Sequence, residues 1–327
     1  MKSYVMEATA ASSNLQLREA AMPEPGPRQL LVRLRAASLN RGEFIVGHGL
    51  QKPGTSKAIG MEGAGEVVKA GPDAGGWRAG DRVMGRCAGA FSEYALMDQA
   101  EAMAVPPALS WEEAAGIPLT FLVSFDMLVL QGRLQAGEWL LINGVSSGVG
   151  VASLQLGKVL GARVIGTSGS AEKLERLRPL GLDGGWCTRA ADFATAVMEA
   201  PDRHGADLVV NAVGGSVFAE NIRAMAFEGR LATVGYVDGM LHADLDLETL
   251  HARRLTLFGV SNKLRTKAQR AAAVPRFVAE VMPHFSSGRI AAQIDQIVPF
   301  EQLPAAKARM EAGRHVGKLV LRMPQAT

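Results

Sequence analysis

Three glycines lie in one short turn between an apolar run and a helical pattern. The apolar run is WLLIN (139–143), and the helical pattern is GVGVASLQLGKVLG (148–161). Residues without a Cβ let the backbone approach a pyrophosphate, and the helix N-terminus supplies N–H donors and a partial positive charge. A glycine motif alone is also compatible with a purely structural turn, but the flanking strand and helix favour dinucleotide binding. The turn residues expected at the cofactor are Gly144, Ser146, Ser147, Gly148, Val149 and Gly150.

Residues from about Leu119 onwards alternate between helical patterns and short apolar strands, which predicts a parallel, doubly wound sheet. The expected strands are Trp139–Asn143, Arg163–Thr167, Asp207–Ala212, Arg230–Gly235 and Thr256–Val260. The expected helices are Phe121–Leu130, Val149–Leu160, Ala171–Leu180, Ala190–Glu199 and Val217–Ala226. A long helical stretch, Lys267–Phe285, follows the last strand.

The first hundred residues consist of short strands and turns, which predict an antiparallel, barrel-like β domain. Turn sequences such as PEPGP, KPGT and GPDAGG separate the strands. The expected strands are Ser3–Thr9, Leu15–Glu19, Gln29–Leu39, Gly63–Ala70, Arg82–Gly85 and Ser92–Leu96. The C-terminal tail returns to a strand–helix–strand pattern that is able to rejoin this domain, with segments at Gln296–Phe300, Glu301–Glu311 and Lys318–Arg322.

Length, charge and cysteine content set the class of protein. A chain of 327 residues exceeds the usual size of a single core, so two domains are expected. The net charge is +3 and the basic residues are scattered, which predicts no nucleic-acid partner and no polybasic membrane patch. The two cysteines form no CxxC motif, which fits a reducing compartment. Because the sequence shows no signal-peptide core and no apolar stretch of about 18 residues, we expect a cytoplasmic protein without membrane segments.

The glycine spacing G-x-x-x-G-x-G is shared by two oxidoreductase families. Short-chain dehydrogenases also need a Tyr-x-x-x-Lys pair, but Tyr4, Tyr94 and Tyr236 each lack a lysine four residues later. The chain instead resembles the medium-chain dehydrogenase/reductase superfamily, specifically its zinc-independent quinone oxidoreductase branch. The segments that carry this resemblance are AASLNRGEF, IGMEGAGEVVKAG, WRAGDRVMG, GAFSEYAL, AAGIPLTFLVSFDML, LQAGEWLLINGVSSGVGVASLQLGK, FEGRLATVG and HVGKLVL.

The resemblance implies an α/β fold in which a doubly wound parallel (Rossmann) sheet is inserted into a GroES-like β-barrel domain. It places the GroES-like catalytic domain at residues 1–118 plus 286–327. It places the Rossmann NADP-binding domain at residues 119–285. Dimers through the nucleotide domain are common in the family, so a homodimer is expected.

Zinc-dependent relatives bind a catalytic zinc ion through a cysteine and a histidine, and this chain has Asn40 and Met61 at the matching places. An amide and a thioether are poor ligands for Zn²⁺. The four-cysteine structural zinc lobe is also missing, and Cys87 alone is expected to be a free thiol. The sequence therefore predicts no metal site. Without a Lewis acid, the substrate itself has to delocalise the negative charge that develops in the reaction, as a quinone or an α,β-unsaturated carbonyl does.

Several further site residues are expected from the resemblance. Asn40 would bind cofactor ribose or a substrate oxygen, or else cap the helix expected at Arg41–Val46. Thr120 would contact the nicotinamide or act as a helix N-cap. Lys318 would reach the cofactor or lie solvated on the surface. Two expected strands end at segments that would hold the carboxamide through backbone groups, namely Val234, Gly235, Phe258, Gly259 and Val260.

The identity of the cofactor follows from the end of the second parallel strand. An acidic residue about 20 positions past the glycines binds the ribose hydroxyls of NAD. Counting from Gly148, that position is Ser168, which is neutral. Gly169 is the next residue, and Lys173 lies where related NADPH-dependent reductases place a phosphate-binding lysine. Arg189, at the end of the next strand, offers a second positive charge near a 2′-phosphate, although both basic residues are compatible with a solvated surface. NADPH is therefore the expected cofactor.

The leading hypothesis is an NADPH-dependent reductase that transfers hydride to a quinone or an α,β-unsaturated carbonyl, a small-molecule substrate. An enoyl-thioester reductase is the alternative, with Arg41, Lys52 and Lys57 available for pantetheine phosphates. A non-catalytic, NADPH-binding structural or RNA-binding protein is a third reading. The modest charge and the lack of interleaved aromatic residues argue against RNA.

The first prediction concerns metal content. Because Asn40 and Met61 replace good zinc ligands, we expect purified protein to carry no stoichiometric zinc and to keep its activity in chelator. Elemental analysis combined with activity assays tests this. About one zinc ion per chain, with activity lost on its removal, would contradict it.

Overall fold

A computed structural model describes residues 1–8, 13–45, 54–199 and 204–324. The chain divides into two compact units, one made of Met1–Leu122 and Lys263–Thr327 and the other of Val123–Asn262. Thr9, Val46 and Lys52, which the sequence analysis placed in expected elements or at a basic surface, lie outside the described residues.

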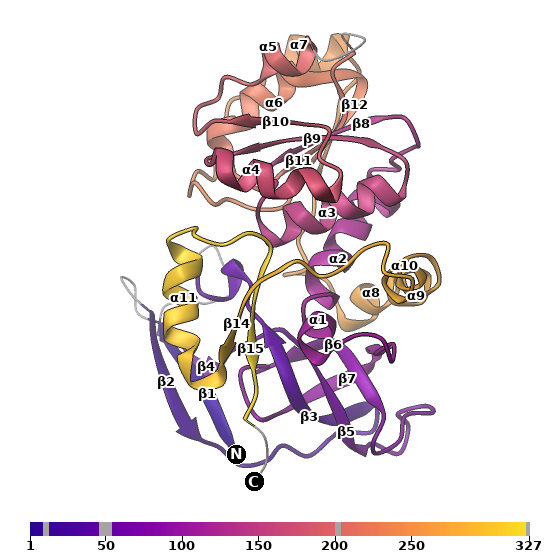
Figure 1. The fold of residues 1–327 in the computed structure, drawn as a ribbon, viewed down its shortest axis with the longest axis vertical. Helices are drawn as coiled ribbons and strands as arrows, with labels where there is room; N and C mark the ends of the chain where they lie inside the picture. Colours follow the sequence, from indigo (N-terminus) through magenta and orange to yellow (C-terminus); the bar gives the residue numbers. More distant parts are fainter. Residues whose placement is uncertain (9–12, 46–53, 200–203, 325–327) are drawn as a thin grey trace. The chain divides into compact units, whose positions relative to one another are not determined.

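The second unit is built on a six-stranded parallel sheet (Figure 1). The strand order is β10-β9-β8-β11-β12-β13, so the winding direction reverses between β8 and β11. A switch point of this kind is where open parallel sheets bind ligands. The strands are β8 (Trp139–Asn143), β9 (Arg163–Ser168), β10 (Gly184–Cys187), β11 (Ala206–Asn211), β12 (Met225–Thr233) and β13 (Thr256–Gly259). The predicted parallel sheet is confirmed, with β10 as an addition.

Helices cover both faces of this sheet, with α3 and α4 on one side and α5, α6 and α7 on the other (Figure 1). Their bounds are α3 (Gly148–Val159), α4 (Ala171–Leu177), α5 (Ala194–Met198), α6 (Phe218–Ala224) and α7 (Leu247–Ala252). Close helix–sheet packing depends on Gly157, where an added Cβ would lie 2.8 Å from Leu140 Cδ2. Buried side chains such as Leu141, Ile165 and Val209 fill the core between the layers.

The first unit contains a closed ring of antiparallel strands. β3 (Gln29–Ser38) pairs with both β5 (Glu62–Ala70) and β7 (Tyr94–Ala104), and β6 (Arg82–Ala88) pairs with β5 and β7 on the other side. A second sheet joins β1 (Lys2–Ala8) to β2 (Ser13–Glu19) and β4 (Ser56–Ala58). The expected barrel-like domain is thus confirmed. The helix expected after Asn40 is only a 3₁₀ turn, Arg41–Glu43.

The C-terminal tail rejoins this first unit, as predicted. β15 (Lys318–Arg322) pairs antiparallel with β3, and β14 (Ile294–Pro299) pairs parallel with β15. The connection between β14 and β15 contains α11 (Leu303–Glu311), which packs on both strands. α1 (Trp111–Ala115) packs against β3, β5 and β15.

The domain boundaries predicted from the sequence need correction. Residues 263–285 belong to the first unit, and the first crossing between the units falls inside α2 (Pro118–Phe125). Arg270 forms an ion pair with Glu101 of β7 (3.0 Å), and Phe285 packs edge-on against Phe121 with ring centroids 4.8 Å apart. A helical pattern does not reveal which core its apolar face joins, so the sequence misplaced this segment.

The stretch expected as one long helix is three short ones, α8 (Lys267–Ala271), α9 (Val274–Glu280) and α10 (Met282–Ser286). Prolines occupy the first turns of α9 and α10. A helix tolerates proline in its first turn, but the missing N–H would interrupt a longer, continuous helix at these positions.

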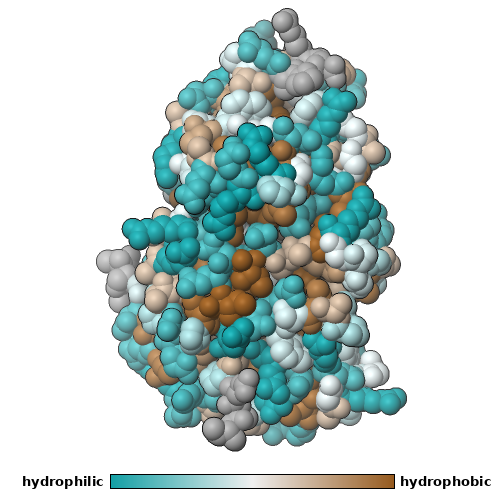
Figure 2. Space-filling view, in the orientation of Figure 1, coloured by the Kyte–Doolittle hydropathy of each residue, from teal (hydrophilic) through white to brown (hydrophobic). Residues whose placement is uncertain are grey.

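No helix in the described part of the chain is both long enough and apolar enough to cross a membrane. The face of the molecule in Figure 2 mixes hydrophilic residues with small apolar patches.

Candidate functional site

The glycine turn joins β8 directly to α3. Gly144 adopts a left-handed φ of 73°, and the N–H groups of Gly144 and Val145 both donate to the carbonyl of Thr167 in β9, at 3.1 and 3.0 Å. Ser147 is the N-cap of α3, because its Oγ accepts from the N–H of Gly150 at 3.1 Å. The turn is therefore held to the sheet on one side and to the helix on the other.

Gly150 explains why the helix begins so close to the strand. A Cβ at this position would lie 2.4 Å from the carbonyl oxygen of Gly144 and 2.6 Å from that of Val145. Any side chain there would push α3 away from the turn. Ser146, Ser147, Gly148 and Val149 remain half-buried at the start of this twelve-residue helix. This arrangement fits a pyrophosphate held by backbone N–H groups.

A buried amide network lies beneath the turn, and sequence reasoning did not identify it. Asn143, the last residue of β8, is fully buried. Its Oδ1 accepts from Thr167 Oγ1 at 2.9 Å, and its Nδ2 donates to Asn221 Oδ1 of α6. The signal in the sequence was the single polar residue at the end of WLLIN. These bonds fix the carboxyl end of β8 against β9.

The end of β9 brings several expected cofactor residues together. Ser168 Oγ lies 3.3 Å from Ser146 Oγ of the glycine turn. Ser170 caps α4, since its Oγ accepts from the N–H of Lys173 at 3.4 Å. Arg189 lies over Gly169, where an added Cβ would be 2.9 Å from the guanidinium carbon. Ser146, Ser168, Gly169 and Arg189 thus form one edge, with Lys173 in the first turn of the helix that follows.

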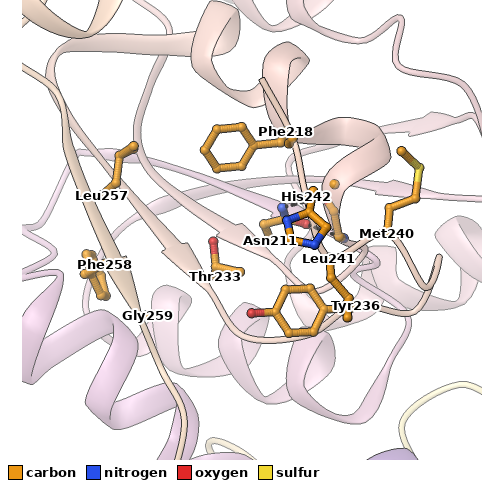
Figure 3. Close-up of a pocket in the computed structure, with 13 residues that line it drawn as sticks. Asn211, Phe218, Thr233, Tyr236, Met240, Leu241, His242, Leu257, Phe258 and Gly259 are labelled. Carbon is orange, nitrogen blue, oxygen red and sulfur yellow. Dashed lines mark hydrogen bonds between the residues drawn. The ribbon is translucent and has the colours of Figure 1, made fainter. Parts of the chain in front are cut away.

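A pocket of about 370 Å³ opens at the carboxyl ends of β11, β12 and β13 (Figure 3). Phe258 and Gly259, two of the expected cofactor residues, line this pocket, but Val234, Gly235 and Val260 are not among its lining residues. Val234 and Val260 instead extend the hydrogen bonding of the sheet. The N–H of Val234 donates to the carbonyl of Asn211, and the N–H of Val260 donates to the carbonyl of Thr233, each at 3.0 Å. The pocket residues that the sequence analysis missed are Asn211, Gly214, Gly215, Phe218, Thr233, Tyr236, Met240, Leu241, His242, Ala243 and Leu257.

In the first unit, Asn40 belongs to a buried charged cluster with Glu43, Glu62 and Lys318. The Lys318 ammonium donates to Leu39 O (3.0 Å), Asn40 Oδ1 (2.7 Å) and Glu62 Oε1 (2.9 Å). Asn40 Nδ2 donates to Glu43 Oε1 at 3.0 Å and to Glu62 Oε1 at 2.9 Å. The second oxygen of Glu62 accepts from the N–H of Leu119, at 2.7 Å, in the first turn of α2.

This cluster corrects two expectations. Lys318 is 4% exposed and uses all three of its N–H donors, so it is neither a solvated lysine nor a donor to the cofactor. Both N–H bonds of the Asn40 amide are engaged by carboxylates, which leaves no donor for a substrate oxygen and only spare acceptor capacity on Oδ1. The hydroxyl of Thr120 is buried in α2 and donates to Gly116 O at 3.1 Å, so the N-cap reading of Thr120 is also wrong.

The place where zinc relatives hold their metal does not fit a metal ion here. The Lys318 ammonium already sits among the oxygens of Leu39, Asn40 and Glu62 and would repel a dication. In the described residues, no group of three or more His, Cys, Asp or Glu side chains is arranged to bind a metal. The nearby Cys87 is a buried free thiol, and burial raises its pKa, with further increases from Glu62 and Glu43.

Burial raises the pKa of Glu43 to about 8, and the neighbouring charge of Glu62 adds to this, against the lowering effects of Asn40 and Lys318. Two buried carboxylates share one amide and one ammonium. Because Glu62 is ion-paired with Lys318, the proton resides on Glu43 at neutral pH.

The second prediction follows from this protonated carboxyl. Between pH 4.5 and about 8, folded Glu43 keeps a proton that the unfolded chain releases, so the unfolding free energy falls as the pH rises through this window. Glu43→Gln keeps the neutral form. Its stability relative to the wild type should therefore increase with pH across the window and level off above it.

Denaturant unfolding at several pH values measures this effect, with Glu19→Gln at an exposed position as the control. A difference between Glu43→Gln and wild type that does not change with pH would show that Glu43 is already ionised in the folded protein.

Two protein-family models match the chain. An alcohol dehydrogenase GroES-like domain matches residues 26–107, and a zinc-binding dehydrogenase model matches residues 148–277. These matches coincide with the barrel of the first unit and with most of the parallel sheet of the second.

Individual proteins of known sequence or structure extend this match over nearly the whole chain. The synaptic vesicle membrane protein VAT-1 homolog of Homo sapiens is 30% identical over 94% of this chain and 82% of its own length. The spectinabilin polyketide synthase system protein NorB of Streptomyces orinoci is 33% identical over 94% of this chain, which spans only 14% of NorB. The structure of mycobacterial Rv1454c complexed with NADPH superposes with a TM-score of 0.88 at 26% identity, covering 98% of this chain and 99% of that one.

The two matched domains, their order along the chain and the 30% identity to a relative of similar length agree with the fold. The chain belongs to the medium-chain dehydrogenase/reductase superfamily.

Proposed function

We propose that this oxidoreductase uses NADPH to reduce a quinone or an α,β-unsaturated carbonyl. The observation that carries the cofactor assignment is the neutral edge at the end of β9, where Ser168 replaces an acidic residue and Arg189 lies over Gly169. A carboxylate at this edge would repel the 2′-phosphate of NADPH, whereas serine hydroxyls and a guanidinium attract it. The NADPH complex of Rv1454c supports the assignment.

The substrate class follows from the cluster around Lys318. A simple ketone needs its oxygen stabilised as an alkoxide, which zinc relatives achieve with a Lewis acid. Here Asn40 and Met61 stand at the positions that match the zinc ligands, the Lys318 ammonium next to Asn40 is saturated by three oxygens, and the Asn40 donors are consumed as well. A conjugated substrate delocalises the charge itself, so hydrogen bonds and orientation suffice.

NADPH supplies the hydride. In an enone the hydride forms a C–H bond at the β-carbon, the C=C π electrons move onto the carbonyl as an enolate, and a solvent proton then adds to the α-carbon. The chain's part is to hold the cofactor at the glycine turn and the β9 edge. Backbone groups after β12 and β13, at Val234, Gly235 and Phe258–Val260, are proposed to orient the nicotinamide, and Thr120 stays a candidate only as an acceptor.

An enoyl-thioester reductase is the second candidate, and the identity to a polyketide synthase protein favours it. Of the basic residues suggested for pantetheine phosphates, Arg41 is half-buried and donates to the carbonyl of Met310 at 2.6 Å. Lys57 is exposed. Both candidates transfer hydride to a conjugated system and differ in whether the substrate is a free quinone or enone or an acyl thioester.

We also propose a cytoplasmic homodimer formed through the second unit. β13 is an edge strand of its sheet, and Tyr236, Val237, Met240 and Leu241, which follow β12, are large apolar residues that are exposed. An edge strand with apolar neighbours is a ready surface for pairing between copies.

The third prediction tests the reaction. With NADPH deuterated at the transferring C4 position, we expect deuterium at the β-carbon of an enone product and solvent hydrogen at the α-carbon. A panel of quinones, enones and enoyl thioesters ranks the two candidates by kcat/KM. Useful oxidation of ethanol or isopropanol by metal-free protein, or deuterium missing from the β-carbon, would contradict the proposal.

The fourth prediction tests the cofactor. A charge-assisted contact to phosphate is worth about 1.5–3 kcal/mol, so Lys173→Ala should weaken NADPH binding by roughly tenfold or more and NADH binding much less. Arg176→Ala, one turn further along α4, is the matched control for losing a cation. Equal affinities of wild type for the two cofactors, or a Lys173→Ala variant with the full NADPH preference, would show that Lys173 does not read the phosphate.

A further inference from the structure

We propose that Gly169 is a specificity-determining residue, because a side chain at 169 would force the guanidinium of Arg189 to shift from its position at the end of β9. This inference rests on the NADPH binding proposed above. Gly169 is proposed to act on cofactor preference through the position of the Arg189 side chain, and not by binding the cofactor with a side chain of its own.

The backbone first brings Arg189 to this place. β10 pairs with β9 up to Cys187 opposite Ser168, and the N–H of Thr188 extends the ladder by donating to Ser168 O at 2.9 Å. The next residue, Arg189, then stands beside the residue after Ser168. An ideal Cβ on Gly169 would lie 2.9 Å from both Cζ and Nε of Arg189 and 3.1 Å from its Cγ. The side chain therefore occupies the volume that any other residue at 169 would fill.

Backbone conformation does not explain a glycine here. The glycines with a positive φ include Gly144, Gly161 and Gly181 of the second unit, but not Gly169. Alanine at 169 would therefore strain no dihedral angle. Its consequence is confined to Arg189, whose guanidinium would have to move off the strand end.

Arg189 is held at this edge without an acceptor. Its side chain is exposed, and within the described ranges its guanidinium makes no hydrogen bond or ion pair. The neighbouring Asp192 instead accepts from Thr188 Oγ1 at 2.7 Å. The chain neighbours of Gly169, Ser168 and Ser170, are neutral. The guanidinium thus keeps its donors for an anion, and the chemistry at this edge suits a phosphate ester on the adenosine ribose.

The consequence is a specificity device made of two residues. With glycine at 169, Arg189 stays where a 2′-phosphate would lie. Alanine displaces the guanidinium and removes part of the preference for NADPH. Aspartate would displace it, pair with it and repel the phosphate, and should therefore shift the preference further towards NADH.

A double-mutant cycle tests the coupling. Dissociation constants for NADPH and NADH are measured by calorimetry for wild type, Gly169→Ala, Arg189→Ala and the double variant, with Gly169→Asp as an additional case. We expect Arg189→Ala to lower the NADPH-to-NADH preference about tenfold and Gly169→Ala to lower it severalfold. In the Arg189→Ala background, Gly169→Ala should have no further effect.

Gly184→Ala is the matched control, because Gly184 lies on the adjacent β10 and an added Cβ would approach only Ile165 Cγ2, at 3.3 Å. Circular dichroism and Tm confirm that each variant folds. If Gly169→Ala does not fold, Gly169→Ser takes its place. The inference would be overturned if Gly169→Ala kept the NADPH-to-NADH preference of the wild type. It would also be overturned if Gly169→Ala lowered this preference equally in the Arg189→Ala background. Neither outcome would affect the proposed NADPH binding. A wild type without preference for NADPH would overturn the proposed cofactor, and the inference with it.

Discussion

The contact between Gly150 and the carbonyl of Gly144 sets the geometry on which the nucleotide-binding unit depends. A Cβ on residue 150 would lie only 2.4 Å from the carbonyl oxygen of Gly144. Helix α3 is therefore able to start so soon after β8 only with glycine at this position. That close approach aims the helix N-terminus at the switch point between β8 and β11. Ser147 then caps the helix, and Gly157 lets its second half lie against Leu140. One steric constraint thus sets the position of α3 relative to β8, and with it the geometry of the proposed anion site.

The first unit depends on a different interaction, the buried ammonium of Lys318. It joins β15 to the end of β3 and to β5, three strands that come from distant parts of the chain. Its partner Glu62 also accepts from the first turn of α2. The Lys318–Glu62 ion pair, at 2.9 Å, thereby lies next to Asn40, one of the two positions that match zinc ligands of the resembling family. The proposed preference for a conjugated substrate rests on this cluster.

Local patterns predicted most of the fold. Hydrophobic runs bounded by turns identified five of the parallel strands, and the GVGVASLQLGK segment identified α3. β10 was missed because GGWC is short, half-exposed and contains two glycines. Residues 263–285 were misplaced because an amphipathic pattern does not specify its partner surface, which here includes Phe121 and Glu101.

The candidate site was predictable where it is local in sequence and not where it depends on long-range contacts. The turn from Gly144 to Gly150 and the neutral Ser168 were predicted as cofactor residues from spacing and the flanking strand and helix, and the structure places Ser146 Oγ 3.3 Å from Ser168 Oγ. Lys318 was misread because its partners Asn40 and Glu62 lie more than 250 residues away in sequence. The buried amide of Asn143 was missed for a similar reason, since its partner Asn221 belongs to another helix.

The most direct test of the account is NADPH binding to a protein altered at the first residue of α3. Gly148→Asp places a carboxylate where the pyrophosphate is proposed to lie, yet an acidic residue in the first turn of a helix favours folding. Calorimetry with Gly148→Ala as the uncharged control separates the effect of charge from that of volume. The account predicts that Gly148→Asp keeps the wild-type Tm or exceeds it while losing NADPH binding by at least about tenfold relative to Gly148→Ala. A folded Gly148→Asp variant with the NADPH affinity of the wild type would contradict it.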